Sequence, residues 1–175
     1  MKEVKITKEL FLSPDFQALT PGKKQLYVVM LAEVEEDGIC RFDIDASELY
    51  NMNYAVMKQQ RQALRDAGFI EYVGPSEFAI LHEGSGPGVK IPRDFLRSDR
   101  FQSLKMSTQL FYMAMWLEAK DGICRFGPKT SKRYGFTHQL TLDYAEGIRQ
   151  AGLLRCKDIN EYRLTPAEGL EVTIL

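Results

Sequence analysis

The second half of this chain repeats the first. In the first part of the match, identical residues recur at an offset of 85: Lys5-Ile6 and Lys90-Ile91, Phe16-Gln17 and Phe101-Gln102, Tyr27 and Tyr112, and Glu33 and Glu118. The offset becomes 84 near Glu35, and the hexapeptide Asp37–Phe42 recurs as Asp121–Phe126. A six-residue identity within a collinear match of about seventy residues indicates an internal duplication. We therefore expect two similar folding units.

The start of the first unit predicts a helix followed by a strand. Thr20 is a suitable N-cap, and Pro21 suits the first helical position. Apolar residues at helical spacing continue the helix to Glu36, where Asp37-Gly38 ends it. Residues 39–44 are then typical of a short strand.

The remainder of the first unit predicts two helices and a hairpin. Residues 45–48, Asp-Ala-Ser-Glu, have the form of a capping box and open a short second helix. Asn53 is a suitable N-cap for a third helix that ends at Gly68. Two strands, Phe69–Val73 and Phe78–Leu81, follow around a turn that contains glycine and proline.

The second unit has the same order of elements. It comprises a helix to about Lys120, a strand at Ile123–Phe126, a short helix near Ser131–Tyr134, a third helix at Thr137–Ala151, and hairpin strands at Leu153–Lys157 and Glu161–Leu164. Helix, strand, helix, helix and hairpin is the order of a winged helix-turn-helix domain. We predict an α+β, mainly helical fold class with two tandem winged-helix domains, residues 1–82 and 90–175. The glycine-rich residues 83–89 are expected to link them.

Composition favours a protein of the reducing cytoplasm. No apolar run reaches the roughly 18 residues of a membrane span, the N-terminus lacks a secretory pattern, and three cysteines form no disulfide framework. We therefore expect no membrane partner. Residues 1–88 carry 9 Lys and Arg against 14 Asp and Glu, whereas residues 89–175 carry 14 against 10. Net charges of −5 and +4 suggest different tasks for the halves or attraction between them.

The third helix of the first unit is the candidate DNA-binding element, because the last helix of a helix-turn-helix enters the major groove. Helical periodicity predicts a core-facing side: Val56, Gln60, Ala63, Leu64 and Ala67. The opposite side then carries the predicted DNA contacts: Tyr54, Lys58, Arg61, Gln62 and Arg65. Lys and Arg neutralise phosphate or bond guanine, and Gln pairs with adenine. An ordinary solvated helix face is the alternative.

The corresponding helix of the second unit has lost most of these side chains. His138, Leu142, Ala145 and Glu146 replace Tyr54, Lys58, Arg61 and Gln62, and only Arg65 persists, as Arg149. Phosphate repels Glu146. Leu142 and Ala145, which we expect to be exposed, suggest a surface for protein: the other unit, a second copy of the chain or a partner.

The second unit keeps cations at other positions. Lys129, Lys132 and Arg133 lie around its short second helix, and Arg155, Lys157 and Arg163 lie on its hairpin. They would suit phosphate contacts that are independent of sequence, and they would equally suit a solvated surface. Both interpretations stay open at this point.

No pattern in the chain favours catalysis. Cys40 and Cys124 occupy equivalent strand positions and are expected to be buried thiols. His82 and His138 lack Cys, Asp or Glu at the spacing of a metal site. There is no P-loop, dinucleotide-binding turn or nucleophile elbow. We therefore expect no enzyme activity, no cofactor and no metal.

A family resemblance accompanies these patterns. Its residues are Lys90-Ile91-Pro92-Arg93-Asp94-Phe95-Leu96, Phe101, Leu104 and Phe111-Tyr112 in the second unit, and Ile6, Phe11, Phe16, Leu19, Tyr27 and Asp37-Gly38 in the first. Both segments resemble the N-terminal winged-helix segment of plasmid replication initiators of Gram-positive type. Residues 63–70, Ala-Leu-Arg-Asp-Ala-Gly-Phe-Ile, resemble the closing motif of many winged-helix regulators. The resemblance implies DNA binding in replication initiation or transcription regulation.

Two functional hypotheses of different class follow. The first is a DNA-binding protein of replication-initiator or transcription-regulator type, whose first unit recognises the major groove of double-stranded DNA while the second positions it or dimerises. The alternative is a non-enzymatic protein–protein interaction scaffold built from tandem winged helices. The net charge of −1 and Leu142 fit the alternative. Binding of a DNA duplex distinguishes the two.

Overall fold

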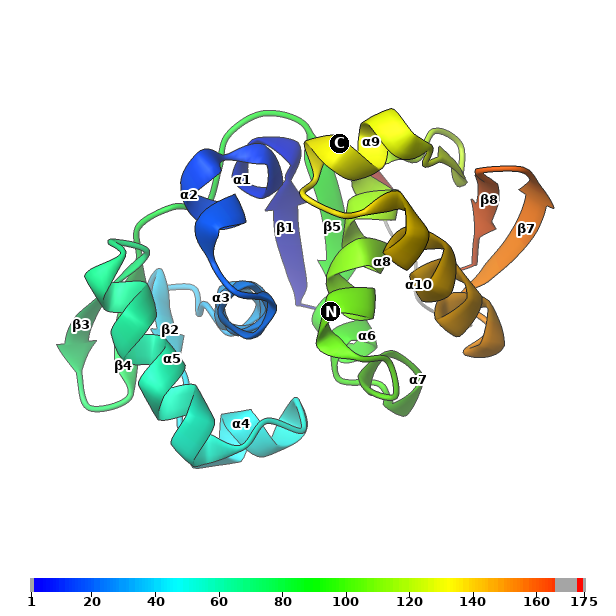
Figure 1. The fold of residues 1–175 in the computed structure, drawn as a ribbon. Coiled ribbons are helices and arrows are strands. Elements are labelled where there is room, and N and C mark those ends of the chain that lie inside the picture. Colours follow the sequence, from blue (N-terminus) through cyan, green and yellow to red (C-terminus); the bar gives the residue numbers. More distant parts are fainter. Residues whose placement is uncertain (1, 166–172, 175) are drawn as a thin grey trace.

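The computed structural model describes residues 2–165 and 173–174 and is a mixed α/β structure (Figure 1). Its strands form three sheets of three strands each. Residues 166–172 and 175, which belong to the predicted second domain, lie outside the described residues, as does residue 1. None of the helices formed by the described residues is long and apolar enough to cross a membrane.

Unit 1, residues 2–80, follows the predicted order of helices and strands after an N-terminal strand and two short helices. Its elements are β1 (Glu3–Thr7), α1 (Lys8–Leu12), α2 (Pro14–Ala18), α3 (Pro21–Ala32), β2 (Ile39–Arg41), α4 (Ile44–Leu49), α5 (Tyr54–Asp66), β3 (Ile70–Gly74) and β4 (Glu77–Ile80). The antiparallel hairpin β3–β4 is joined by β2 in the order β2–β4–β3. This sheet places Cys40 opposite Phe78 in the core.

Unit 2, residues 88–165 with 173–174, repeats that order. Its elements are β5 (Gly88–Pro92), α6 (Arg93–Leu96), α7 (Asp99–Gln102), α8 (Met106–Glu118), β6 (Ile123–Arg125), α9 (Pro128–Arg133), α10 (His138–Gln150), β7 (Leu154–Asp158), β8 (Glu161–Leu164) and β9 (Thr173–Ile174). The sheet order β6–β8–β7 matches that of unit 1. Cys124 lies opposite Tyr162, at the positions equivalent to Cys40 and Phe78.

Local signals account for both ends of α5. The Asn53 side chain caps the helix, because its Oδ1 accepts hydrogen bonds from the backbone N–H groups of Ala55 and Val56. Gly68 follows the last turn with φ of +77°, a left-handed conformation that glycine adopts without steric cost. Both predicted ends of this helix are confirmed.

The short helix α4 begins earlier than the sequence predicted. Asp43, not Asp45, is its N-cap, and Asp43 Oδ1 accepts a hydrogen bond from the backbone N–H of Ala46 at 2.9 Å. The preceding strand therefore ends at Arg41 rather than at Ile44. The sequence offered two aspartates as N-cap, Asp43 and Asp45, and either carboxylate can cap a first turn. The helix begins at the first of them.

A third sheet, which the sequence analysis did not predict, joins the two units. Strand β1 pairs with β5 in antiparallel register, with Lys5 opposite Lys90, and β9 continues the sheet beyond β5. Lys5 and Lys90 are also equivalent in the repeat, so exchanging the two strands leaves the register unchanged. The units therefore meet about a local two-fold axis. The predicted linker is shorter than expected, because Gly88 and Val89 belong to β5.

Helices α3 and α8 lie side by side between the two units (Figure 1). Both are apolar on nearly every side, which is characteristic of helices that are buried all round. Tyr27 and Tyr112, at equivalent positions near the middle of each, have no exposed surface. The cores of both units form one continuous apolar cluster through this helix pair.

A buried carboxylate of unit 1 binds cations of unit 2. Glu33, at the end of α3, lies 3.2 Å from Arg93 Nη1 and 2.6 Å from Arg97 Nη2. The Tyr50 hydroxyl, from unit 1, donates a hydrogen bond to the same carboxylate. Three donors therefore compensate the desolvation of a side chain that is almost fully buried.

The equivalent carboxylate of unit 2 makes the reciprocal contact. Glu118, at the end of α8, lies 2.8 Å from Lys8 Nζ of unit 1, and the Tyr134 hydroxyl donates to it at 2.7 Å. Although burial alone would raise the pKa of Glu118, Lys8 and Tyr134 together hold that pKa below its ordinary value. Each unit thus binds the other through the same pair of positions, as in a two-fold symmetric dimer.

Candidate nucleic-acid interface

Helix α5 packs against unit 1 through a narrow apolar face. Met57 and Leu64 are fully buried there, and Ala63 and Gln60 are half-buried beside them. Leu64, Ala63 and Gln60 lie on the predicted core side. Met57 replaces Val56, which is 50% exposed, and Ala67 is also exposed. The buried face is therefore rotated by about one residue position from the predicted one.

This rotation buries Arg61, so the prediction that Arg61 lies on the exposed side of the helix is wrong and the side chain is not placed to contact DNA. The side chain is 4% exposed, and its Nη1 donates a hydrogen bond to the carbonyl oxygen of Phe42 at 2.8 Å. The guanidinium lies 4.9 Å from the centroid of the Phe78 ring. A carbonyl oxygen and an aromatic face stabilise the cation in place of water. Arg61 is a structural residue that ties α5 to the sheet.

The exposed side of α5 keeps Lys58, Gln62 and Arg65. Their spacing of four and then three residues places them in one stripe along the helix. Gln62 Nε2 donates to Asp66 Oδ1 at 2.8 Å in solvent, and the Arg65 guanidinium lies 5.4 Å from the centroid of the Tyr72 ring. Neither contact buries its residue, and all three side chains are exposed.

Tyr54, the first residue of α5, exposes only part of its ring to a DNA partner. It is half-buried and packs against the apolar core, with its ring 5.8 Å from the Arg61 guanidinium. A contact with a partner would involve only part of this ring.

Helix α10 buries the same side as α5 but carries different side chains. Leu142 is 40% exposed, as expected. Ala145 is buried at the position equivalent to Arg61, so the expectation that it is exposed for a protein contact is wrong. Glu146 forms hydrogen bonds with Arg149 and Gln150, and the Arg149 guanidinium lowers the Glu146 pKa to about 2. This carboxylate is therefore ionised at neutral pH and partly neutralises the cation that persists from unit 1.

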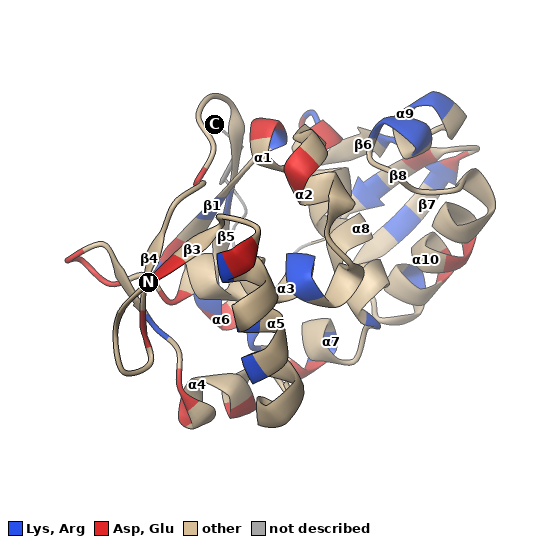
Figure 2. Ribbon diagram, turned by 60° about the vertical axis from the view of Figure 1, so that its left-hand side comes forward, with Lys and Arg blue, Asp and Glu red and all other residues tan. Residues whose placement is uncertain are grey.

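The predicted cations of unit 2 lie on exposed surface. Figure 2 shows Lys and Arg on α9 and on strands β7 and β8. On α9, Lys129 and Lys132 are exposed, whereas Arg133 Nη2 lies 2.8 Å from Glu118 Oε2. Lys129 and Lys132 are therefore better placed than Arg133 to contact a phosphate without losing an ion pair.

Neither cysteine of the repeated hexapeptide is placed for surface chemistry. Cys40 and Cys124 are fully buried, as predicted, and burial raises the pKa of both thiols. The described part of the chain brings no three His, Cys, Asp or Glu side chains together in a way that could hold a metal ion.

The chain was compared with known proteins at three levels. No family model, curated protein or solved structure matched it. The interpretation of these surfaces therefore rests on their own geometry.

Proposed function

We propose that this protein binds double-stranded DNA and that α5 lies in the major groove. The observation that carries the proposal is the exposed stripe of Lys58, Gln62 and Arg65 on the third helix of a helix, strand, helix, helix and hairpin unit. In helix-turn-helix proteins the last helix of such a unit enters the groove. We accordingly assign both units to the winged-helix fold and derive them from one duplicated ancestor. The resemblance to plasmid initiators favours replication initiation or transcription regulation.

The three side chains suit different parts of a duplex. Lys58 and Arg65 are about 10 Å apart along the helix axis, since each residue rises about 1.5 Å, so they can contact phosphate or guanine at separate positions. Gln62 lies between them and has an amide that can pair with adenine. Its present partner, Asp66, is exposed. Exchanging that hydrogen bond for one to a base therefore costs little.

The local two-fold axis gives unit 2 a related but unequal role. Helices α5 and α10 lie on either side of the α3–α8 pair (Figure 1). Two-fold DNA-binding proteins place one such helix on each half-site. Here α10 presents Leu142 and Glu146 instead of Lys58 and Gln62. We therefore assign unit 2 to phosphate contacts through Lys129 and Lys132 of α9, and we expect an asymmetric rather than a palindromic target.

A pair of matched double variants tests this proposal. The target is first enriched from a random duplex pool, and affinity is then measured by fluorescence anisotropy. Lys58→Ala with Arg65→Ala should weaken binding at least about tenfold, since each base or phosphate contact contributes roughly 1–3 kcal/mol. Leu142→Ala with Arg149→Ala, at the equivalent positions of α10, should leave affinity within about twofold. Equal losses in both variants, or no enrichment by the unaltered chain, would reject the proposal.

A protein-interaction scaffold is the second candidate, and one observation favours it. Leu140 and Leu142 of α10 are 46% and 40% exposed, and Ile159 at the tip of the unit 2 hairpin is 88% exposed. Exposed apolar side chains of this size are typical of protein contacts. On this hypothesis unit 2 binds a second copy of the chain or a protein partner. Leu140→Ser with Leu142→Ser would then abolish assembly in sedimentation without changing the fold.

A further inference from the structure

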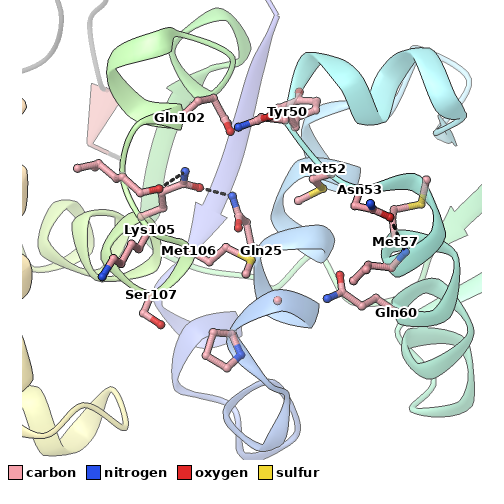
Figure 3. A pocket seen from close by; sticks show the side chains of 16 residues that line it. Gln25, Tyr50, Met52, Asn53, Met57, Gln60, Gln102, Lys105, Met106 and Ser107 are labelled. Atoms are coloured by element: carbon pink, nitrogen blue, oxygen red, sulfur yellow. Dashed lines mark hydrogen bonds between the residues drawn. The ribbon is translucent and has the colours of Figure 1, made fainter.

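A pocket of about 750 Å³ lies where the DNA-binding half of unit 1 meets unit 2. In Figure 3, Met52, Met57 and Gln60 come from one side of the pocket, Lys105, Met106 and Ser107 from the other, and Gln25 of α3 lies between them. The volume is within the range of small-molecule sites, roughly 300–1,000 Å³. Of the described residues that line it, Lys105 alone carries a charge, and its side chain is exposed.

The local two-fold axis supplies an internal comparison for this pocket. The equivalent pocket on the other side, between unit 2 and the start of α3, measures about 250 Å³. There Phe136 and Tyr144 stand at the positions of Met52 and Gln60. The two sides of the joint therefore differ both in pocket volume and in lining residues.

One polar atom beside the larger pocket lacks a partner. Gln109 Nε2 donates to the carbonyl oxygens of Phe101 and Leu104, at 3.1 and 3.0 Å, which fixes the orientation of its amide. Gln109 Oε1 must then accept the hydrogen bond from Gln25 Nε2. Gln25 Oε1 is left as an acceptor that receives no hydrogen bond from any residue the structure describes. The atom has almost no accessible surface, so a molecule in the pocket reaches it only when the Gln25 side chain turns toward the pocket.

We propose that this pocket binds a small, uncharged aromatic molecule that donates an N–H or O–H hydrogen bond to Gln25 Oε1. A buried carbonyl oxygen without a donor costs free energy, which a ligand donor recovers. The thioethers of Met52, Met57 and Met106 suit an aromatic ring, since sulfur makes favourable contacts with ring edges. The lining residues include no acidic side chain, and the one cation, Lys105, is exposed to solvent, so the pocket favours an uncharged ligand.

The pocket lies between the proposed DNA-binding helix and unit 2, so a bound ligand would contact both. Asn53, the N-cap of α5, and Met57 in its second turn line one side, and residues of α7 and α8 line the other. A bound molecule therefore contacts the proposed DNA-binding helix and unit 2 at once. If the proposed function holds, the pocket is an effector site at which ligand and DNA affinity are coupled.

Two bicyclic probes of nearly identical shape test the site on the full chain without DNA. Indole carries a ring N–H, and benzofuran has an oxygen in its place. Titration followed by protein NMR should show shifts confined to the pocket, with benzofuran about tenfold weaker than indole because it cannot donate to Gln25. Equal binding of the two probes, or no shifts with millimolar indole, would overturn the proposal.

Variants locate the binding. A filled variant, Met52→Phe with Val56→Leu and Gln60→Tyr, introduces the larger side chains of the smaller pocket and should weaken indole binding at least about tenfold, whereas Tyr144→Phe in the smaller pocket should not change it. Undiminished binding by the filled variant would place the probe elsewhere and overturn the assignment. The effector role is tested separately with the enriched duplex: saturating indole should change its affinity in the unaltered chain and not in the filled variant. If indole binds the unaltered chain but changes the duplex affinity of neither protein, the effector role is rejected and the binding site itself is not.

Discussion

Lys5 and Lys90 lie directly opposite one another in the antiparallel pairing of β1 with β5, and they are also the residues that the sequence repeat aligns. A pairing register that maps onto itself in this way is also found where two copies meet in a symmetric dimer. The reciprocal contacts of Glu33 and Glu118 agree with that arrangement. The chain therefore has the geometry of a two-fold dimer whose two halves are covalently joined.

The buried carboxylate of Glu33 should be essential for the joint between units. Glu33→Ala leaves Arg93 and Arg97 without their acceptor, and loss of one member of a buried ionic cluster costs about 3–5 kcal/mol. Urea unfolding measures the loss. Glu36→Ala, at an exposed position four residues from the end of α3, should change stability by less than about 0.5 kcal/mol. Similar values for the two variants would contradict the role assigned to Glu33.

The reciprocal carboxylate predicts a pH dependence. Because the pKa of Glu118 is lowered in the folded state, the unfolded chain takes up its proton first as the pH falls. The stabilisation from Glu118 is therefore complete above the ordinary glutamate pKa of 4.5 and is lost as the pH falls through the lower folded-state value. Unfolding of the unaltered chain and of Glu118→Gln should show a stability difference that shrinks from about pH 6 to about pH 3. A difference that stays constant would contradict this account.

Substitution of Arg61 should affect stability without affecting the proposed DNA binding. Arg61→Ala removes the hydrogen bond to Phe42 and the stacking on Phe78, so it should lower the free energy of unfolding by about 2–3 kcal/mol. The folded variant should bind the enriched duplex within about twofold of the unaltered chain, since the side chain is buried. A loss of affinity like that expected for Lys58→Ala with Arg65→Ala, at temperatures where the variant is folded, would place Arg61 in the proposed interface after all.

Two glycines in the same region should respond to alanine with opposite signs. Gly147 lies inside α10, where an added Cβ meets only Thr108 Cγ2 at 3.9 Å, and unit 1 has Ala63 at the equivalent position. Gly147→Ala should stabilise the chain by about 0.5–1 kcal/mol. Gly152 has φ of +73°, so Gly152→Ala should destabilise it by about 1–2 kcal/mol. Thermal unfolding measures both changes in stability. If both variants were stabilised, or both destabilised, the prediction would be contradicted.

The elements that could be predicted from the sequence are those fixed by neighbouring residues. Asn53 and Gly68 bounded α5 correctly because a cap and a left-handed glycine act within one turn. Both hairpins were placed for the same reason. The β1–β5 pairing was missed because its partners are far apart in the chain and each strand has only five residues. Such pairing depends on how the units meet, which no local pattern encodes.

The error at Arg61 has a different cause. A charged residue was assigned to the solvent side because isolated charges are costly to bury. Burial became possible through the Phe42 carbonyl and the Phe78 ring, which tertiary folding brings to α5. The repeat held only a weak signal, because Ala145 stands where unit 1 has Arg61 but Leu142, at the position of Lys58, is exposed. An apolar residue in the second unit therefore does not identify the buried face.

The salt dependence of duplex binding tests the central claim most directly. Each phosphate contact contributes about 0.9 to the slope of log affinity against log salt concentration. If α5 contacts DNA through Lys58 and Arg65, the double alanine variant should weaken binding and reduce that slope by up to about 2, while the matched variant Leu142→Ala with Arg149→Ala keeps the slope of the unaltered chain. An affinity and slope unchanged by removing Lys58 and Arg65 would contradict the claim that this helix binds DNA.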